Sequence, residues 1–314
     1  MPSRPLSRRD IVVGCLTVVG FSGCSESSSR PAQLGAESVT AHSIPAGSDR
    51  LAVFDMKHDN QAVSSVSNAI LTGEEFNSIP DPVAALPTDT TGPLADTDVG
   101  KLACISSNET DGSAAIVWAR WTDENLANAL GSNVTQESSA PDSDRIRYRT
   151  ATSSAARLAD TAFVVGDHET VRSVIDVWHH GGDVVSEGAL APFERTDRNA
   201  LVRFATQFLP ERDGTRPRQY DRIENGSTAL KSVDAGTKLT IEYQVDSIDS
   251  APTVESALED DLVESPHPPS AVGLEVDVGR TADVIHVSCE ADESTVSDSG
   301  ADLITAARKA VEGV

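Results

Sequence analysis

Apolar residues follow two periods along the chain, one typical of helices and the other of strands. The clearest helix carries apolar residues at i, i+3, i+4 and i+7 from Val171 to Trp178, a spacing that places them on one helical face. Asp167 stands where it can cap the first turn, and Gly181-Gly182 stands where the helix can end. The apolar run from Ala162 to Gly166 predicts a strand directly before this helix.

Alternation of apolar and polar residues predicts further strands, each with one buried face. Leu239 to Val245 alternates without a break, and the alternation returns between Val272 and Val278. We expect strands at 51–56, 115–121, 145–150, 162–166, 199–208, 239–245, 272–278 and 284–289, and helices at 63–70, 122–131, 167–180, 252–262 and 303–311.

The order of these elements predicts an internal repeat. A β-α-β-β-α order begins at Ala115 and returns at Leu239, with corresponding elements starting 122 to 132 residues apart. Because βαββαβ is the ferredoxin-like order, we expect an α+β fold of two tandem ferredoxin-like units, over 49–195 and 196–314. Each unit would have an antiparallel sheet with helices on one face. The strand at 51–56 is expected to complete the second sheet, and 74–100, which holds four prolines, to form a long exposed loop.

The first 24 residues have the features of an export signal. Arg8-Arg9 precedes an apolar run from Ile11 to Phe21, which is too short for a membrane-spanning helix. Ser22-Gly23-Cys24 resembles a lipobox, which implies cleavage before Cys24 and lipidation of its thiol. We therefore expect a twin-arginine signal with a lipobox at 1–24 and a flexible tether at 25–48. The mature protein would be anchored to the outer face of the cytoplasmic membrane by lipid on Cys24.

Composition adds a charge that excludes one class of partner. There are 49 acidic and 25 basic residues, a formal charge of −24, and Arg outnumbers Lys by 20 to 5. Nucleic acid is not an expected partner, because phosphate binding needs clusters of Lys and Arg. The surplus of Asp and shortage of Lys resemble the proteins of halophilic archaea, in which concentrated salt screens self-repulsion. An ordinary acidic protein from moderate salt is the alternative.

Two cysteines and three sequons are candidate sites of covalent modification. Cys104 and Cys289 each share a face with apolar neighbours, so the two thiols either pair as a disulfide or lie separately in the core. The sequence favours neither reading. Three asparagines match the N-glycosylation pattern in segments expected to be loops: Asn108, Asn133 and Asn225.

The sequence leaves two classes of function open. No catalytic motif, cofactor motif or metal-ligand spacing is present, so no cofactor and no metal are expected. The first hypothesis is a non-enzymatic binding or scaffolding protein of the cell envelope, whose partner is an envelope protein or a glycan. Trp118 and Trp121 are three apart along an expected strand and so point to opposite faces. Either one, if exposed, would be a contact for a glycan, and a packed aromatic is the alternative. The second is an envelope hydrolase with a site between the two halves, for which His58 and His286 are the best-placed histidines.

One block of the chain resembles a known group of proteins. Val164-Val165-Gly166-Asp167, the helix after it and the strand from Ala200 to Phe204 resemble an uncharacterised family of exported archaeal and bacterial proteins. In that family the same block is usually present once per repeat. The resemblance implies tandem α+β repeats and no catalytic residues.

Overall fold

A computed structural model describes eleven segments of the chain: 44–56, 61–72, 76–88, 91–95, 97–107, 112–136, 146–185, 191–208, 217–234, 236–264 and 274–312. The chain divides into two compact units, Met1–Ala32 and Gln33–Val314, and every described residue belongs to the second. The predicted export signal, with Arg8, Arg9 and Cys24, lies outside the described residues. In the described part of the chain, no helix is long and apolar enough to cross a membrane.

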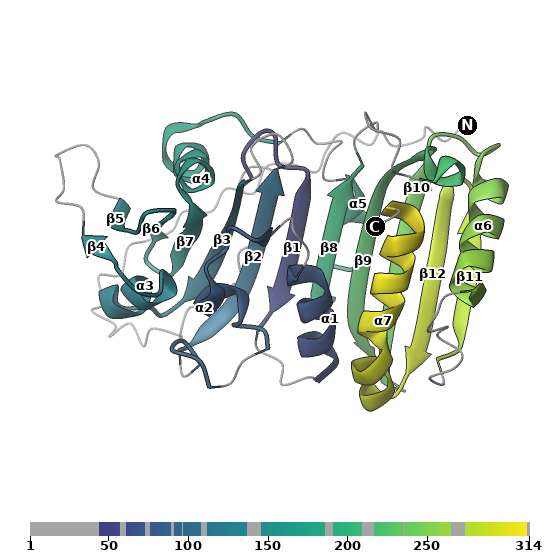
Figure 1. The fold of residues 1–314 in the computed structure, drawn as a ribbon, viewed down its shortest axis with the longest axis horizontal. Helices are drawn as coiled ribbons and strands as arrows, with labels where there is room; N and C mark the ends of the chain where they lie inside the picture. Colours follow the sequence, from purple (N-terminus) through teal and green to yellow (C-terminus); the bar gives the residue numbers. More distant parts are fainter. Residues whose placement is uncertain are drawn as a thin grey trace, which may run out of the picture. The chain divides into compact units, whose positions relative to one another are not determined.

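The second unit is built on one antiparallel sheet of 12 strands, in the order β11-β12-β10-β9-β8-β1-β2-β3-β7-β6-β5-β4 (Figure 1). The structure confirms a mixed α+β fold with a large antiparallel sheet. The strands are β1 (Arg50–Asp55), β2 (Val99–Ser107), β3 (Gly112–Ala119), β4 (Thr135–Gln136), β5 (Ile146–Arg149), β6 (Ser153–Ala159), β7 (Ala162–Asp167), β8 (Val202–Gln207), β9 (Ile223–Val233), β10 (Gly236–Val245), β11 (Val276–Thr281) and β12 (Val284–Ala291).

The two faces of the sheet carry different helices. The helices are α1 (Gln61–Leu71), α2 (Asp81–Ala84), α3 (Asp123–Ala129), α4 (His168–His180), α5 (Ala191–Arg195), α6 (Ala251–Glu264) and α7 (Glu293–Glu312), with a 3₁₀ turn η4 (Arg218–Tyr220). One core cluster joins one sheet face to buried residues of α1, α2, α3, α6 and α7. We call this the α7 face. A second cluster joins the opposite face to α4 and α5.

Burial of the strands explains this distribution of helices. Every residue of β3 is buried, as are all but the last residue of β7, so the first half of the sheet needs cover on both faces. Strands β10 and β12 alternate buried and part-exposed residues, so the second half has only one apolar face. Accordingly α4, which follows β7, packs on one face, whereas α7, which follows β12, packs beside α1 on the other.

The strand order does not confirm two ferredoxin-like units. A βαββαβ order that begins at β3 ends at β8, and a ferredoxin-like unit would pair these two strands, but β1 and β2 lie between them. Strand β1 pairs with both β8 and β2 and so lies at the junction, where it does not close a separate second sheet. The sequence analysis missed β2, which falls at the end of the expected loop. Its six central residues, Gly100 and Leu102–Ser106, are buried, and a strand this apolar requires partners on both edges.

Two segments expected to be exposed are part of the core. Ile44, placed in the predicted tether, is fully buried, and the adjoining Pro45 bridges to Val184. The folded body therefore begins before residue 49. Within the predicted loop at 74–100, Phe76, Val83 and other apolar residues are buried on the α7 face. The prolines here shape a packed connection that includes α2.

The caps of α4 confirm the prediction for that helix. One carboxylate oxygen of Asp167 accepts hydrogen bonds from the amides of Glu169 and Thr170, at 2.9 and 3.1 Å. Gly181 has a left-handed φ of 67° at the C-terminal end, a conformation that glycine adopts without strain. Helix α7 begins after Asp292, whose pKa is lowered because its carboxylate accepts hydrogen bonds from Ser294 and Thr295.

The two cysteines are separate core residues. Cys104 on β2 and Cys289 on β12 are both buried and free, and four strands lie between theirs in the sheet. At a strand spacing near 4.8 Å the two positions are about 24 Å apart, whereas bridged Cα atoms lie within about 7 Å. A disulfide between them is therefore incompatible with this fold.

We expect neither thiol to react with an alkylating reagent while the protein is folded. Once the protein unfolds, both thiols should react without prior reduction, because neither is in a disulfide. Burial raises the pKa of Cys104 and Cys289, which leaves little thiolate to react. Alkylation with iodoacetamide in native buffer and in guanidinium, followed by peptide mass analysis, measures this. Recovery of a Cys104–Cys289 disulfide peptide would contradict the fold.

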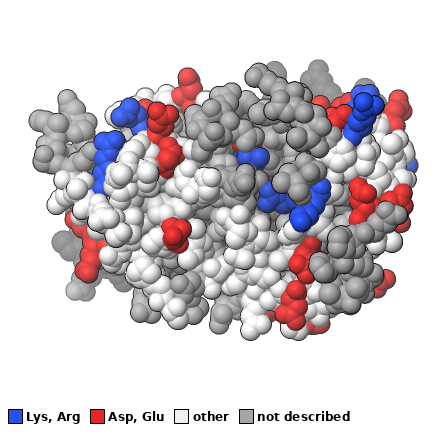
Figure 2. All heavy atoms as spheres, in the orientation of Figure 1, with Lys and Arg blue, Asp and Glu red and all other residues white. Residues whose placement is uncertain are grey.

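Charged side chains of both signs are spread over the surface. Figure 2 shows acidic groups scattered over one face of the molecule, and basic groups at its upper left, at its upper right and near its middle. This is the side of the molecule on which α1 and α7 are in front of the sheet (Figure 1).

Candidate functional site

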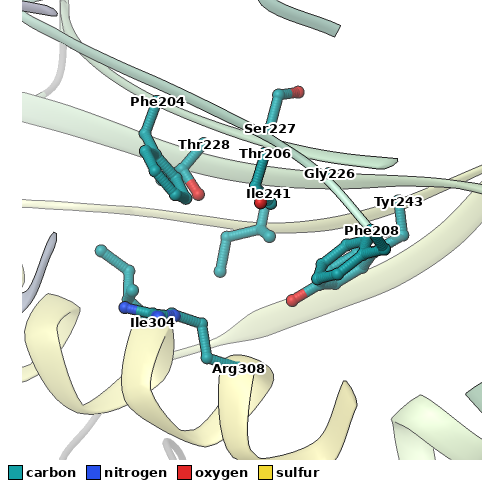
Figure 3. Close-up of a pocket in the computed structure, with 10 residues that line it drawn as sticks. All are labelled: Phe204, Thr206, Phe208, Gly226, Ser227, Thr228, Ile241, Tyr243, Ile304 and Arg308. Carbon is teal, nitrogen blue, oxygen red and sulfur yellow. The ribbon is translucent and has the colours of Figure 1, made fainter. Parts of the chain in front are cut away.

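A pocket lies between α7 and the three strands beneath it, β8, β9 and β10 (Figure 3). The space between its walls is about 310 Å³, a value that includes open solvent, and the enclosed cavity is about 20 Å³. Its lining is mainly apolar and aromatic. The lining residues are Phe204, Thr206, Phe208, Gly226, Ser227, Thr228, Ile241, Tyr243, Ile304 and Arg308.

Aromatic rings stand at both ends of this pocket, which we call the α7 pocket. Figure 3 shows Phe204 at one end, and Phe208 with Tyr243 at the other. The rings of Phe208 and Tyr243 lie with centroids 6.5 Å apart and planes inclined by 34°, a favourable offset arrangement. Gly226 permits it, because a Cβ there would lie 3.3 Å from both rings. The ends of the pocket are thus suited to flat or aliphatic groups.

The helix contributes one apolar and one charged side chain. Ile304 and Arg308 are four residues apart on α7 and therefore share a helix face. Long helical side chains lean toward the N-terminus of their helix, and Figure 3 shows Arg308 extending along α7 toward Ile304. Ile304 is buried and Arg308 is part-exposed. The guanidinium therefore brings a positive charge to an otherwise neutral pocket.

A row of polar residues crosses the sheet at the level of the pocket. Thr206 on β8 is directly opposite Arg50 on β1, and Arg50 is in turn opposite Ser106 on β2. Directly opposite side chains on an antiparallel pair point to the same face, so all three are on the α7 face. The Ser106 side chain is 2% exposed, and its hydroxyl has no hydrogen-bond partner among the described residues. Arg50 thus lies one strand away from the nearest strand that lines the pocket, and the unsatisfied hydroxyl of Ser106 lies two strands away.

The three sequons differ in accessibility. Asn133 is exposed in a turn after α3 with a left-handed φ of 63°. Asn225 lies within β9, where its side-chain oxygen accepts a hydrogen bond of 3.1 Å from Arg195. It is therefore not in the loop that the sequence analysis expected. Asn108 lies outside the described residues.

The described residues do not form a catalytic triad. His286 pairs with Glu242 at 3.3 Å but has no serine or cysteine partner in the structure's described part. His168, which the sequence analysis did not consider for catalysis, is 2.5 Å from the hydroxyl of Ser154. Its other ring nitrogen faces Arg149 and a backbone carbonyl, with no acid there. His58 lies outside the described residues, which contain no group of three potential metal ligands.

The described surface has few exposed aromatic or large apolar side chains that a protein or glycan partner could contact. Trp118 and Trp121 point to opposite faces, as predicted, and both are buried, so neither offers a stacking surface for a sugar. Among the described residues, the large apolar side chains that are exposed are Val184, Ile248 and Val263. Three residues do not make a docking patch. The α7 pocket is therefore the best candidate site.

Comparison with known proteins informs the fold alone. No protein-family model matches the chain, and no curated protein matches it in sequence. The chain is similar to the solved structure described as crystal form III of TP0453, with a TM-score of 0.50 and 8% identity. The match covers 85% of this chain and 99% of that one. Crystal form I of the same protein gives a TM-score of 0.48 at 8% identity, over 85% and 99% of the two chains.

We expect Gly226→Val to destabilise the protein by about 1–3 kcal/mol, because the new side chain displaces two packed rings. Gly279→Val is the matched control, since Gly279 also lies in a strand but no atom lies within 4 Å of its added Cβ. Valine there should be neutral or slightly stabilising. Urea unfolding of the variants measures this. Equal stability of the two would show that the rings are not seated over Gly226.

Proposed function

We propose that this chain is an exported, lipid-anchored, non-enzymatic binding protein that holds a small apolar molecule in the α7 pocket. The observation that carries the proposal is the aromatic and aliphatic lining of that pocket. Burial of apolar ligand surface supplies roughly 25 cal/mol per Å², and the offset rings at one end favour a flat group.

The anchoring part of the proposal is supported by the N-terminal sequence. Arg8-Arg9, the apolar run and Ser22-Gly23-Cys24 have the order of an export signal that ends in a lipid attachment site. We propose that lipid on Cys24 holds the folded unit at the outer face of the cytoplasmic membrane. Residues 25–43 are then a sufficient length of chain for a tether.

We also propose that the folded unit consists of two tandem α+β units, with a strand order that differs from the ferredoxin-like order expected from the sequence. From β1 the strands lie in the order β1-β2-β3-β7-β6, and from β8 they lie in the order β8-β9-β10-β12-β11. Each series therefore has the same sequence of neighbours, with β4 and β5 as additions to the first. The antiparallel pair β1 and β8 would join the two units.

We expect the full chain to bind 4-phenylbutanol, a neutral probe with one ring and a short aliphatic chain. Isothermal titration calorimetry should give a dissociation constant of roughly 10⁻⁴ M for a ligand of this size. Gly226→Val should weaken binding at least tenfold because the valine occupies the pocket, while Gly279→Val should bind as the parent does. Equal binding by both variants would place the ligand elsewhere, and no binding by the parent would remove the pocket from the proposal.

Lipid attachment has its own test in cells. We expect the parent protein to sediment with membranes and Cys24→Ser to be released, because a bare serine cannot carry the lipid. Intact mass of the membrane form should match a chain that begins at Cys24 with a lipid adduct. Cys104→Ser is the control and should remain with the membrane. A membrane-bound form of the protein that retains Met1 would contradict the anchoring proposal.

A further inference from the structure

We infer that the α7 pocket selects ligands that carry an oxyanion, a carboxylate or a phosphate, and that Arg50 and Arg308 bind that group. This inference rests on the proposed function and names the chemical class of its ligand. The apolar body of the ligand would lie among the rings of the pocket, and its charged end would lie over the polar row formed by Ser106, Arg50 and Thr206.

The register of the sheet places Arg50 beside the pocket. Arg50 is opposite Thr206, a lining residue, and the two belong to neighbouring strands about 4.8 Å apart. Alternation along β1 puts Arg50 on the same face as Ala52 and Phe54, which belong to the core of the α7 face. Arg50 is part-exposed, so its guanidinium can reach both pocket and solvent.

Arg308 approaches from the opposite wall. It extends from α7 over the strands that carry Thr206 and Phe204 (Figure 3). Two arginines from two layers of the structure therefore border one pocket. Both make other contacts as well, so an oxyanion would join an existing set of partners. A guanidinium binds carboxylate and phosphate through paired N–H donors.

Ser106 is the second, independent sign of a ligand. Its hydroxyl is buried next to Arg50 and has no hydrogen-bond partner among the described residues, and such a group costs free energy unless something satisfies it. Ser113, opposite Ser106 on β3, accepts a hydrogen bond from the amide of Ser78, whereas the hydroxyl of Ser106 has no such partner in the described part of the chain. A ligand oxygen held by Arg50 would be placed to accept the Ser106 proton.

The negative charge of the whole chain restricts where an anion can bind. A formal charge of −24 repels anions in general, so an anion would bind only where local cations outweigh the surrounding field. Figure 2 shows basic side chains in several separate groups on one face of the molecule, one of them near its middle. Paired arginines beside an apolar pocket would make this the favoured anion site of the described surface.

The test compares two probes that differ only in charge, 4-phenylbutyrate and 4-phenylbutanol, on the full chain by calorimetry. We expect the carboxylate to bind at least tenfold more tightly than the alcohol, because charge-assisted hydrogen bonds are the stronger kind. Arg50→Gln should remove most of that preference and leave alcohol binding unchanged, whereas Arg308→Gln, at a residue that lines the pocket, should weaken binding of the carboxylate more than binding of the alcohol. Lys309→Gln, which removes the same charge from the next, exposed residue of α7, should retain the preference.

The Ser106→Ala variant distinguishes a loss of carboxylate binding from a failure to fold. It removes an unsatisfied hydroxyl, so the free protein should be as stable as the parent or slightly more stable, while the carboxylate should bind several-fold more weakly and the alcohol as before. If the alcohol binds and the carboxylate binds no better, the inference is wrong and the proposed function stands. If neither probe binds, the proposed function fails with it.

A second pair of probes separates the sources of the oxyanion. Dihexanoyl phosphatidic acid is compared with dihexanoylglycerol, which lacks the phosphate, both as monomers. Tighter binding of the phosphatidic acid than of 4-phenylbutyrate would support the inference with a lipid head group as the oxyanion, and the reverse order would support it with a free carboxylate. Equal binding of phosphatidic acid and dihexanoylglycerol would count against the arginines as the determinant.

Discussion

The pairing of β1 with β8 is the interaction on which the rest of the structure depends. These strands are neighbours in the sheet although residues 56–201 separate them in the chain. Their pairing makes one continuous sheet out of two series of strands with the same order of neighbours. Leu51 to Phe54 are all buried, so β1 is covered on both of its faces. The junction also sets Arg50 next to Thr206, and so brings the N-terminal strand to the edge of the pocket.

The pocket follows from a difference between the two halves. In the first half, buried strands are covered on both sides, and α4 lies on the side opposite α7. In the second half, β10 and β12 offer one apolar face, so α6 and α7 both pack there beside α1. Helices packed about 8–10 Å apart each cover roughly two strands of 4.8 Å spacing. The α7 pocket lies where α7 passes over three strands, β8, β9 and β10.

Strong periodicity made much of the fold predictable, and its absence explains what was missed. The helix at 168–180 and the alternating β10 were predicted because their patterns are unbroken. The sequence analysis missed β6 and β9, since Ser153–Ala159 is mainly Ser and Ala, and the central residues of β9 include Gly226, Ser227 and Thr228. Small residues carry little strand propensity, and here burial between neighbouring strands determines their structure.

The site was less predictable than the fold because its members come from distant segments. Arg50, Ser106 and Arg308 share no motif, and only the register of β1 with its neighbours brings the first two together. A sequence-level signal did exist at Gly226, a glycine inside a strand, which often marks a close approach of another group. That glycine also lies within the sequon at Asn225, and the sequon was given the greater weight. The structure shows that the residue serves packing, since its missing side chain is the space in which Phe208 and Tyr243 lie.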